Sequence, residues 1–348
     1  MKKRNEMYIK IKKFTKQMIN LYHFVVLFYL LCFFLFGDQF NLIAFFSNFV
    51  PLIFLPSLLY LPLSIWKRKI FWVSVNFLLF LFVVYFFGNR LFNNSAEKTK
   101  NHSSLTVLSY NVGQNLPDFQ KLEQFINTNK SCDVLFLQEV TEEYLEQHLP
   151  HVKALFPFQF SGPMIGKNKA GMVMLSKHLL KDTLNFKLVK DGLVFQQFAT
   201  IVKDDSPINL YNIHLTYPWI SYQSVYPPLK YPYWDTKIRE QEVQVLIDLL
   251  VNNEHPVILA GDFNFNELSD NYQQLTQVVD DAFVNKGAGF GFTWPARSTP
   301  TVPIKLSGIP FNRIDYIFYS SQLEAKKSNR ILFYESDHFP VYAELEFK

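Results

Sequence analysis

Three long apolar runs in the first ninety residues constrain this chain most, because each is about long enough to cross the hydrocarbon core of a bilayer as a helix. They cover about 18–36, 43–66 and 70–87. Short polar stretches separate them, "GDQFN" after the first run and "KRK" after the second. The sequence therefore predicts an all-α transmembrane region of about three helices over 18–88, behind a basic N-terminus over 1–17.

The middle run contains Pro51, Pro56 and Pro62, which break an isolated soluble helix but are tolerated where neighbouring helices satisfy the freed backbone groups. We expect a kinked crossing, with a re-entrant hairpin as the alternative. A cleaved signal peptide is disfavoured for the first run, because no small-residue cleavage site follows it and two more apolar runs do.

Basic residues predict the orientation of these crossings. Seven Lys or Arg residues precede the first run, and Lys67, Arg68 and Lys69 lie between the second and third. The positive-inside rule makes both segments cytoplasmic. With three crossings of a plasma (inner) membrane, the rest of the chain lies on the periplasmic or extracellular side. If the middle run only dips into the bilayer, the side is reversed.

The net charge differs between the two parts of the chain. Residues 1–100 carry 13 Lys/Arg and 3 Asp/Glu, whereas residues 101–348 carry 21 and 27, so their balances are +10 and −6. Nucleic-acid-binding proteins gain much of their affinity from basic residues. Nucleic acid is therefore the less favoured partner of the larger part. The two cysteines, Cys32 and Cys132, imply no disulfide framework.

After a polar linker over 89–104, the pattern changes to short strands and amphipathic helices. Strands are expected at 105–111, 133–139, 171–177, 193–203, 208–215, 256–264, 313–320 and 339–347, with helices over 116–129 and 236–252. Strands dominate and helices interleave, so residues 105–348 are predicted to form an α/β sandwich in which helices cover paired sheets.

Polar side chains lie at the ends of most of these strands. They are Asn111, Glu139, His214, Asp262, Asn264, Asp315, Asp337 and His338. Each alone is explained as well by a turn or a helix cap. Because strand ends of one sheet layer meet at a rim, the set as a whole predicts a shared cleft.

The residue types in this set suit metal-assisted chemistry. Glu139 and Asn111 offer oxygen ligands for a hard cation, Mg²⁺ in first place with Mn²⁺ or Ca²⁺ as alternatives, and zinc is disfavoured because there is no His/Cys cluster. A His338 side chain oriented by Asp315 would have a fixed tautomer and could take a proton from water.

The remaining residues suit phosphate chemistry. Asp262 and Asn264, two positions apart in a "GDFN" turn, would orient that water and stabilise a developing oxyanion. His214 and Asn264 would hold phosphoryl oxygens. The set predicts metal-assisted hydrolysis of a phosphate ester or anhydride.

The motifs "SYNV", "LQEV", "NIHL", "GDFN", "RIDYIF" and "SDHFPV" occur in that order over 105–348. With them the chain resembles the endonuclease/exonuclease/phosphatase superfamily, which has the DNase I-like fold. The resemblance implies a four-layer α/β sandwich, a divalent metal at Glu139 and Asn111 with Asp337 nearby, and a His338–Asp315 pair that activates water. Gly113 departs from the abasic-site endonucleases of the superfamily, which carry an acid there.

The apolar runs add a second resemblance, to bacterial membrane proteins associated with vancomycin and teicoplanin resistance. It implies a membrane-anchored phosphohydrolase that acts on a lipid phosphate or pyrophosphate, such as a polyprenyl pyrophosphate, in the bilayer. The alternatives are an endonuclease or phosphodiesterase acting on nucleic acid outside the cytoplasm, and a non-enzymatic module. No protein partner follows from the sequence.

An aromatic stretch, "HLTYPWISYQSVYPPLKYPYW", runs from His214 to Trp234. Its prolines disfavour a helix or a central strand, so a loop is expected. We predict that four of its aromatic side chains enter the membrane interface and bind substrate: Trp219, Tyr222, Tyr226 and Trp234. The alternative is an Ω-loop that packs on the edge of the sandwich.

Overall fold

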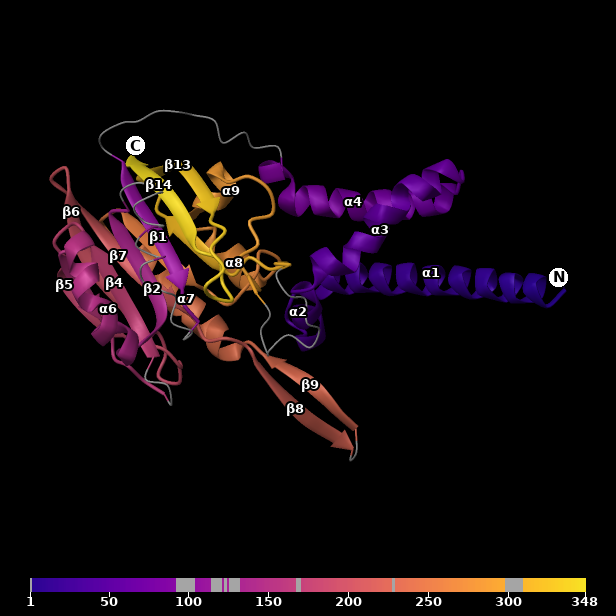
Figure 1. Cartoon of the computed structure of the whole chain (residues 1–348), viewed down its shortest axis with the longest axis horizontal. Coiled ribbons are helices and arrows are strands. Elements are labelled where there is room, and N and C mark those ends of the chain that lie inside the picture. The colour runs from indigo at the N-terminus through magenta and orange to yellow at the C-terminus, as the bar shows by residue number, and fades with distance from the viewer. Residues whose placement is uncertain are drawn as a thin grey trace. The chain divides into compact units, whose positions relative to one another are not determined.

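The structure, a computed structural model, describes residues 2–91, 104–113, 121, 124, 132–166, 170–226, 229–297 and 309–348. The chain forms two compact units, Met1–Phe86 and Phe87–Lys348 (Figure 1). The expected helix over 116–129 lies, except for positions 121 and 124, outside the described residues.

The N-terminal unit is built from helices. They are α1 (Lys2–Phe36), α2 (Asn41–Ser47), α3 (Val50–Trp66) and α4 (Ile70–Leu91), whose last turn belongs to the second unit. Two of them, α1 and α4, are long and apolar enough to cross a membrane, and α2 with α3 makes a third candidate that is bent by 63°. The bend lies between the two helices, whereas Pro56 and Pro62 are accommodated inside α3.

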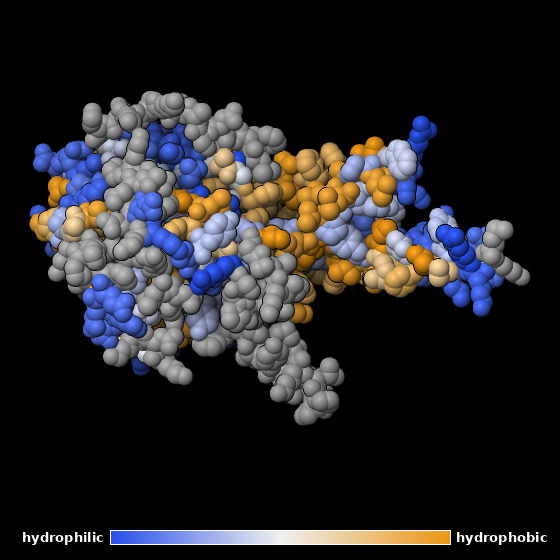
Figure 2. Space-filling model, in the orientation of Figure 1, coloured by the Kyte–Doolittle hydropathy of each residue, from blue (hydrophilic) through white to orange (hydrophobic). Residues whose placement is uncertain are grey.

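Helix α1 begins at Lys2, so the basic segment expected to precede it is part of the same helix. Residues 2–36 contain no Gly or Pro, and the basic segment is rich in Lys, a good helix former. Large apolar side chains gather over the helical unit (Figure 2). Phe24, Leu59 and Phe71 are each about two-thirds exposed. Apolar exposure on this scale marks an interaction surface and is typical of helices in contact with lipid.

Polar contacts join the helices of this unit from inside. His23 Nε2 lies 3.1 Å from Asn76 Oδ1, which links α1 to α4. The Tyr22 hydroxyl donates to the Ile53 carbonyl at 2.6 Å and lies 2.8 Å from Ser57 Oγ, which links α1 to α3. Hydrogen bonds of this kind are common between helices that pack in a membrane.

Two six-stranded sheets form the second unit. The first sheet has the order β13 (Leu323–Arg330), β14 (Val341–Phe347), β1 (Leu105–Asn111), β2 (Val134–Thr141), β4 (Ala170–Ser176), β3 (Phe158–Ser161). The second sheet has the order β11 (Asp280–Asp281), β12 (Asp315–Tyr319), β10 (Val257–Asp262), β7 (Ser206–His214), β6 (Gln196–Lys203), β5 (Lys181–Phe186).

Strand alternation explains how these sheets pack. In β10, Ile258 and Ala260 point into a core shared by both sheets, and Val257 and Leu259 point to the opposite face. That face is covered by helices α7 (Lys237–Val251) and α8 (Asp270–Leu275), and α6 (Glu142–Leu155) covers the outer face of the first sheet. A short helix, α9 (Ala282–Lys286), packs beside β12 and β13. The α/β sandwich predicted from the sequence is confirmed.

The aromatic stretch after His214 is a β-hairpin, so the expectation of a loop was wrong. Its strands are β8 (Trp219–Tyr226) and β9 (Leu229–Asp235), which form a two-stranded sheet of their own. Pro232 pairs with Tyr222. A two-stranded sheet tolerates proline because each strand has an outer edge where no ladder partner is lost. The side chains of Trp219, Tyr222 and Tyr226 lie outside the described residues, and Trp234 is half-buried.

Candidate active site

Strand register places three of the predicted residues in a row. Strand β10 pairs in parallel with β7 and antiparallel with β12, so Asp262 lies opposite His214 on one side and Asp315 on the other. All three side chains are buried. The three residues therefore meet at one edge of the second sheet because their strands end or begin there.

The first sheet contributes two more residues from the neighbouring strand ends. Asn111 closes β1, and its amide nitrogen donates to Asp262 Oδ2 at 3.0 Å and to Glu139 Oε1 at 3.3 Å. Glu139 lies on an irregularity of β2, between Leu137 and Val140, with a φ of +57°. The site thus draws residues from both sheets, whereas the sequence suggested the rim of one sheet layer.

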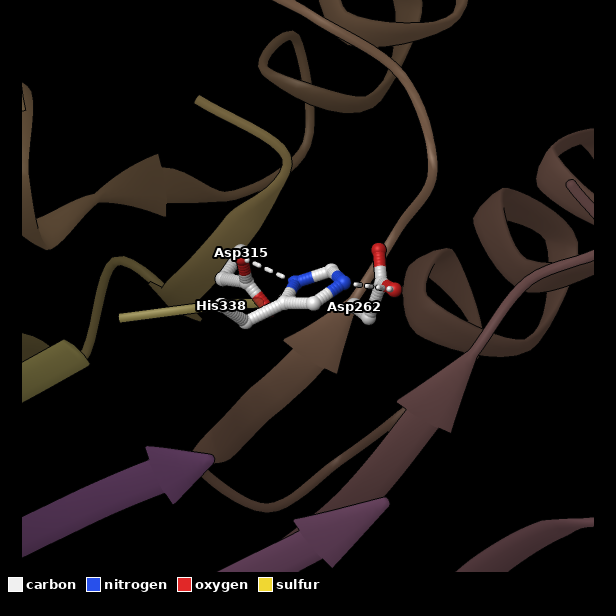
Figure 3. A group of neighbouring side chains, drawn as sticks. All are labelled: Asp262, Asp315 and His338. Atoms are coloured by element: carbon white, nitrogen blue, oxygen red, sulfur yellow. Dashed lines mark hydrogen bonds and ion pairs between the residues drawn. The ribbon is translucent and has the colours of Figure 1, made fainter. Parts of the chain in front are cut away.

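His338 and Asp315 form a pair inside the protein (Figure 3). His338 Nδ1 lies 2.9 Å from Asp315 Oδ2, and its Nε2 lies 3.8 Å from Asp262 Oδ2 on the other side of the ring. Burial alone would lower the pKa of His338, but the Asp315 and Asp262 carboxylates raise it well above its usual range. The imidazole is therefore held in one orientation by Asp315, and the two carboxylates favour its uptake of a proton.

Asp262 lies at the centre of the site. Nε2 of His338 and Nε2 of His214 are each 3.8 Å from its Oδ2 atom, and its Oδ1 accepts from the Asn264 backbone at 2.9 Å. Burial raises the pKa of Asp262 to about 6, with a further upward contribution from Asp315 against the two histidines. A carboxyl group with such a pKa can exchange a proton near neutral pH.

Two of the residues predicted to bind metal, Glu139 and Asp337, each lie beside the turn over Asn111 and Gly113. Glu139 Oε1 lies 3.8 Å from His214 Nε2, and its side chain is 27% exposed. The Asn111 amide oxygen accepts from the Gly113 backbone at 2.9 Å, so the group that Asn111 turns toward Glu139 is its NH₂. A Cβ on Gly113 would lie 2.6 Å from Asp337 Oδ1, so the Asp337 carboxylate occupies the space beside this glycine.

The carboxylates of the predicted set suit a hard divalent cation, whereas the Asn111 NH₂ group that faces Glu139 is not a metal ligand. Carboxylate oxygens of Glu139 and Asp337 flank the Asn111 turn. A second group of potential ligands, with donor atoms within 4.8 Å of one another, consists of Asp262, Asp315 and His338. His338 and Asp315 of this group are engaged with each other, whereas Glu139 and Asp337 offer carboxylate oxygens of the kind that hard divalent cations prefer.

Two hydroxyl groups that the sequence did not single out brace the site. Ser336 Oγ donates to the Asn111 carbonyl at 2.8 Å and accepts from the His338 backbone at 3.2 Å. Thr293 Oγ1 accepts from the Asp315 backbone at 3.3 Å. Single hydroxyl groups in loops carry no distinctive pattern, so their role is visible only in the folded chain.

Helix α7 holds two of the site segments. Glu242 accepts from the Thr216 backbone at 2.8 Å and from its hydroxyl at 2.9 Å, just after His214. Arg239 donates to the Asn264 carbonyl, and Asn264 Nδ2 donates to the Leu215 carbonyl at 2.9 Å. One feature of the sequence could have indicated these two residues. Arg239 and Glu242 are charged but occur at the spacing of the apolar, buried face of the helix.

The aromatic residues contribute one neighbour of the site. Tyr217, just before the hairpin, is 43% exposed, and burial together with the Glu139 carboxylate raises its pKa. The Tyr217 side chain therefore lies close enough to Glu139 for an electrostatic interaction.

Comparisons with known proteins support the fold. A family model described as Endonuclease/Exonuclease/phosphatase family matches residues 108–338. An endonuclease/exonuclease/phosphatase family protein from Leptotrichia buccalis is similar at 21% identity, with a TM-score of 0.52, over 70% of this chain and 100% of that one. None of the curated proteins matches the chain.

Two further solved structures are similar. The endonuclease/exonuclease/phosphatase from Bacteroides vulgatus has 18% identity and a TM-score of 0.53, over 71% of this chain and all of that one. D. rerio TDP2, complexed with a single-strand DNA product, has 21% identity and a TM-score of 0.54, over 70% of this chain and 99% of that one. At these identities the structures establish the fold.

Proposed function

This chain belongs to the endonuclease/exonuclease/phosphatase family, and we propose that it is a membrane-anchored, divalent-metal-dependent phosphohydrolase acting on a lipid phosphate or pyrophosphate. Hydrolysis of phosphate esters is the reaction class that the family indicates. The observation that carries the proposal is the buried His338–Asp315 pair, whose free ring nitrogen faces Asp262 in a site that also contains Glu139.

Each residue of the site has its own role in the proposed hydrolysis. Asp315 orients His338 through Nδ1, so Nε2 is the atom that accepts a proton from the attacking water. Asp262 lies 3.8 Å from that nitrogen and orients the water. His214 and Asn264 bind the phosphoryl oxygens that gain charge during bond cleavage.

Metal binding is assigned to Glu139, with Asn111 and Asp337 beside it. Mg²⁺ suits these oxygen donors, and Mn²⁺ or Ca²⁺ are alternatives. A cation held there would neutralise the charge that builds on the phosphoryl group. Because the Asn111 NH₂ donates to Glu139 and Asp262, Asn111 also keeps the two carboxylates close to one another.

A lipid substrate is favoured by two features. Two helices, and up to three, are able to cross a membrane by length and composition. The part of the chain from residue 101 carries 21 Lys/Arg against 27 Asp/Glu, which is unfavourable for binding polyanionic nucleic acid. Hydrolysis of nucleic acid is the second candidate, because the similar D. rerio TDP2 was solved with a single-strand DNA product.

The hairpin is proposed to bring the site to its substrate. Four residues separate the hairpin from the β7 strand end at His214, and the hairpin carries the four aromatic residues Trp219, Tyr222, Tyr226 and Trp234. Tryptophan and tyrosine favour the membrane–water interface, where an apolar ring and a polar group are both satisfied. Substitution of Trp219 and Trp234 by Ser is expected to impair hydrolysis of a membrane-embedded substrate more than that of a soluble phosphate ester. Equal losses on both would refute the interfacial role.

The side of the membrane is proposed from charge. A cytoplasmic N-terminus and three crossings of the plasma membrane place the second unit on the periplasmic or extracellular side. Reporter fusions after Lys348 test this directly. A cytoplasmic signal would show that only two segments cross.

The function itself is tested with the purified full-length chain in detergent. A polyprenyl pyrophosphate, a phospholipid and plasmid or single-stranded DNA are offered in parallel, with and without Mg²⁺. We expect Mg²⁺-dependent phosphate or headgroup release from a lipid, abolished in Glu139→Ala and His338→Ala. Glu254→Ala and His255→Ala remove exposed residues of the same types and serve as controls. Cleavage of DNA with lipids untouched would overturn the lipid proposal.

A further inference from the structure

Four charged side chains lie buried together next to the active site. They are Arg90, Glu267, Asp281 and Arg313, all less than a tenth exposed. Arg90 comes from the last turn of α4, which clusters with the second unit from Phe87 onward. Arg90 also precedes the residues 108–338 that match the family model.

The four charges form one alternating chain. Arg90 donates through both terminal nitrogens to the two carboxylate oxygens of Glu267. Arg313 donates from Nε to Glu267 Oε1 at 2.6 Å and from Nη2 to Asp281 Oδ2 at 2.6 Å. Each of the inner members, Glu267 and Arg313, has two partners of opposite charge, so the cluster is neutral only when Arg90 is present.

Aromatic rings close the cluster off from solvent. The Arg90 guanidinium lies 5.1 Å from the ring centre of Phe87 and 5.7 Å from that of Phe283. The Arg313 guanidinium lies 4.4 Å from the ring centre of Tyr316. A charge in such surroundings is stable when it is paired and costly when it is not.

This cluster is joined to the catalytic segments through a few bonds. Glu267 lies three residues after Asn264 on the loop that leaves β10, and Arg313 lies two residues before Asp315. The Tyr316 hydroxyl contacts the Arg313 carbonyl at 2.7 Å and the Phe265 carbonyl at 3.1 Å. The loop and the start of β12 are therefore held as one body.

Loss of Arg90 would leave two buried carboxylates with one guanidinium. Glu267 would then be drawn toward solvent or another donor, and the loop that carries Asn264 would move with it. A small displacement of groups that bind a reacting phosphate has a large effect on rate.

We propose that Arg90 is a positioning residue of the active site, which fixes the loop after β10 and the start of β12 by completing the buried charge cluster. The functional catalytic unit of this chain accordingly begins within the last turn of α4, upstream of Leu105. In its effect on catalysis, this inference rests on the proposed hydrolase function.

The test uses the full-length chain in detergent and the variants Arg90→Met, Arg90→Gln and Arg90→Met/Glu267→Gln. Arg4→Met, which removes an exposed arginine, is the control. Arg90→Met is expected to lower kcat about 10- to 100-fold while KM stays within about twofold. The double variant, in which the unmatched carboxylate is also removed, is expected to recover most of the lost kcat. An unchanged kcat in Arg90→Met, or no recovery in the double variant, would overturn the inference.

Hydrogen–deuterium exchange gives a second readout that needs no substrate. In Arg90→Met, amides of 263–268 are expected to exchange faster than in the wild type, while those of β1 stay unchanged. If the wild type hydrolyses none of the substrates, the proposed function fails, and this exchange pattern still decides the role of Arg90. If Arg90→Met does not fold, Arg90→Gln takes its place. If neither folds, recovery of folding in the double variant supports the pairing, and its absence overturns it.

Discussion

An alanine at Gly261 is expected to separate the two strands that carry His214 and Asp262. Gly261 lies in β10 opposite Ile213 of β7, one residue before each of these side chains. Its φ is +152°, a conformation that L side chains rarely adopt. A Cβ at this position would lie 1.7 Å from the Ile213 carbonyl oxygen and 2.7 Å from the carbonyl carbon.

The required movement follows from these distances. A Cβ essentially never approaches another heavy atom within 3.0 Å, so the backbones must part by at least about 1.3 Å, the difference between 3.0 and 1.7 Å. A displacement of about 1 Å at reacting groups costs about 100-fold in rate, or about 2.7 kcal/mol. Overpacking of this kind also costs about 1–3 kcal/mol of stability. We therefore expect kcat/KM to fall about 100-fold in a protein that still folds.

Initial rates of phosphate release, measured together with thermal unfolding, check this expectation. Gly166→Ala is the matched control, because Gly166 also has a positive φ, of +78°, but a Cβ there meets nothing within 4 Å. In both variants an alanine adopts a positive φ, but only in Gly261→Ala does its Cβ collide with the Ile213 backbone. If both lose activity to the same small extent, the close approach of β7 and β10 does not position the site.

Three further expectations concern the cation, the pair and the helix that supports the site. Chelation of divalent cations should abolish hydrolysis. Added Mg²⁺ should raise the melting temperature of the wild type more than that of Glu139→Ala, since a ligand stabilises the state that binds it. Equal shifts in melting temperature would contradict the assignment of Glu139 as a metal ligand. Asp315→Asn should lower kcat by about 10²- to 10⁴-fold with little change in KM, because His338 loses the acceptor that orients it. A change in KM alone would argue against a catalytic role of the His338–Asp315 pair. Burial raises the pKa of Glu242 above 4.5, so its contribution to stability is fully present below pH 4.5 and is lost as the pH rises through the raised pKa. Between pH 4.5 and 7.5, the melting temperature of Glu242→Gln should therefore fall less than that of the wild type. If the melting temperatures of both proteins change in parallel with pH, the raised pKa of Glu242 does not cause the loss of stability.

The central strands were predictable from the sequence because both of their faces are buried. The run over 105–111 is β1 with the expected bounds, and β10 lies within the expected 256–264. Strands β5 and β13 were not predicted. Their sequences, "KDTLNF" and "LEAKKSNR", belong to the edges of the sheets, where polar side chains face water and the apolar run disappears.

The sequence was sufficient to predict which residues belong to the site, but not how they are arranged in space. Polar residues after apolar strands indicated a shared cleft, and the structure brings them together. The order of the strands, which places Asp262 between His214 and Asp315, depends on pairings between distant segments. So does the orientation of the Asn111 amide, which is set by the backbone of Gly113 and by two carboxylates. Local patterns contain no information on such pairings.

Two of the six described non-glycine residues with a positive φ belong to the site. Glu139 and Asn264 both have a positive φ, +57° and +54°. Asparagine tolerates this conformation, but for glutamate it costs about 1–2 kcal/mol. At Glu139 the irregular pairing between Leu137 and Val140 re-aims the side chain toward His214 and Asn111. Local propensity alone would favour glycine or asparagine there, so a glutamate at this position lowers the stability of its own strand. That cost is explained by a carboxylate whose position matters more than its fit to the backbone.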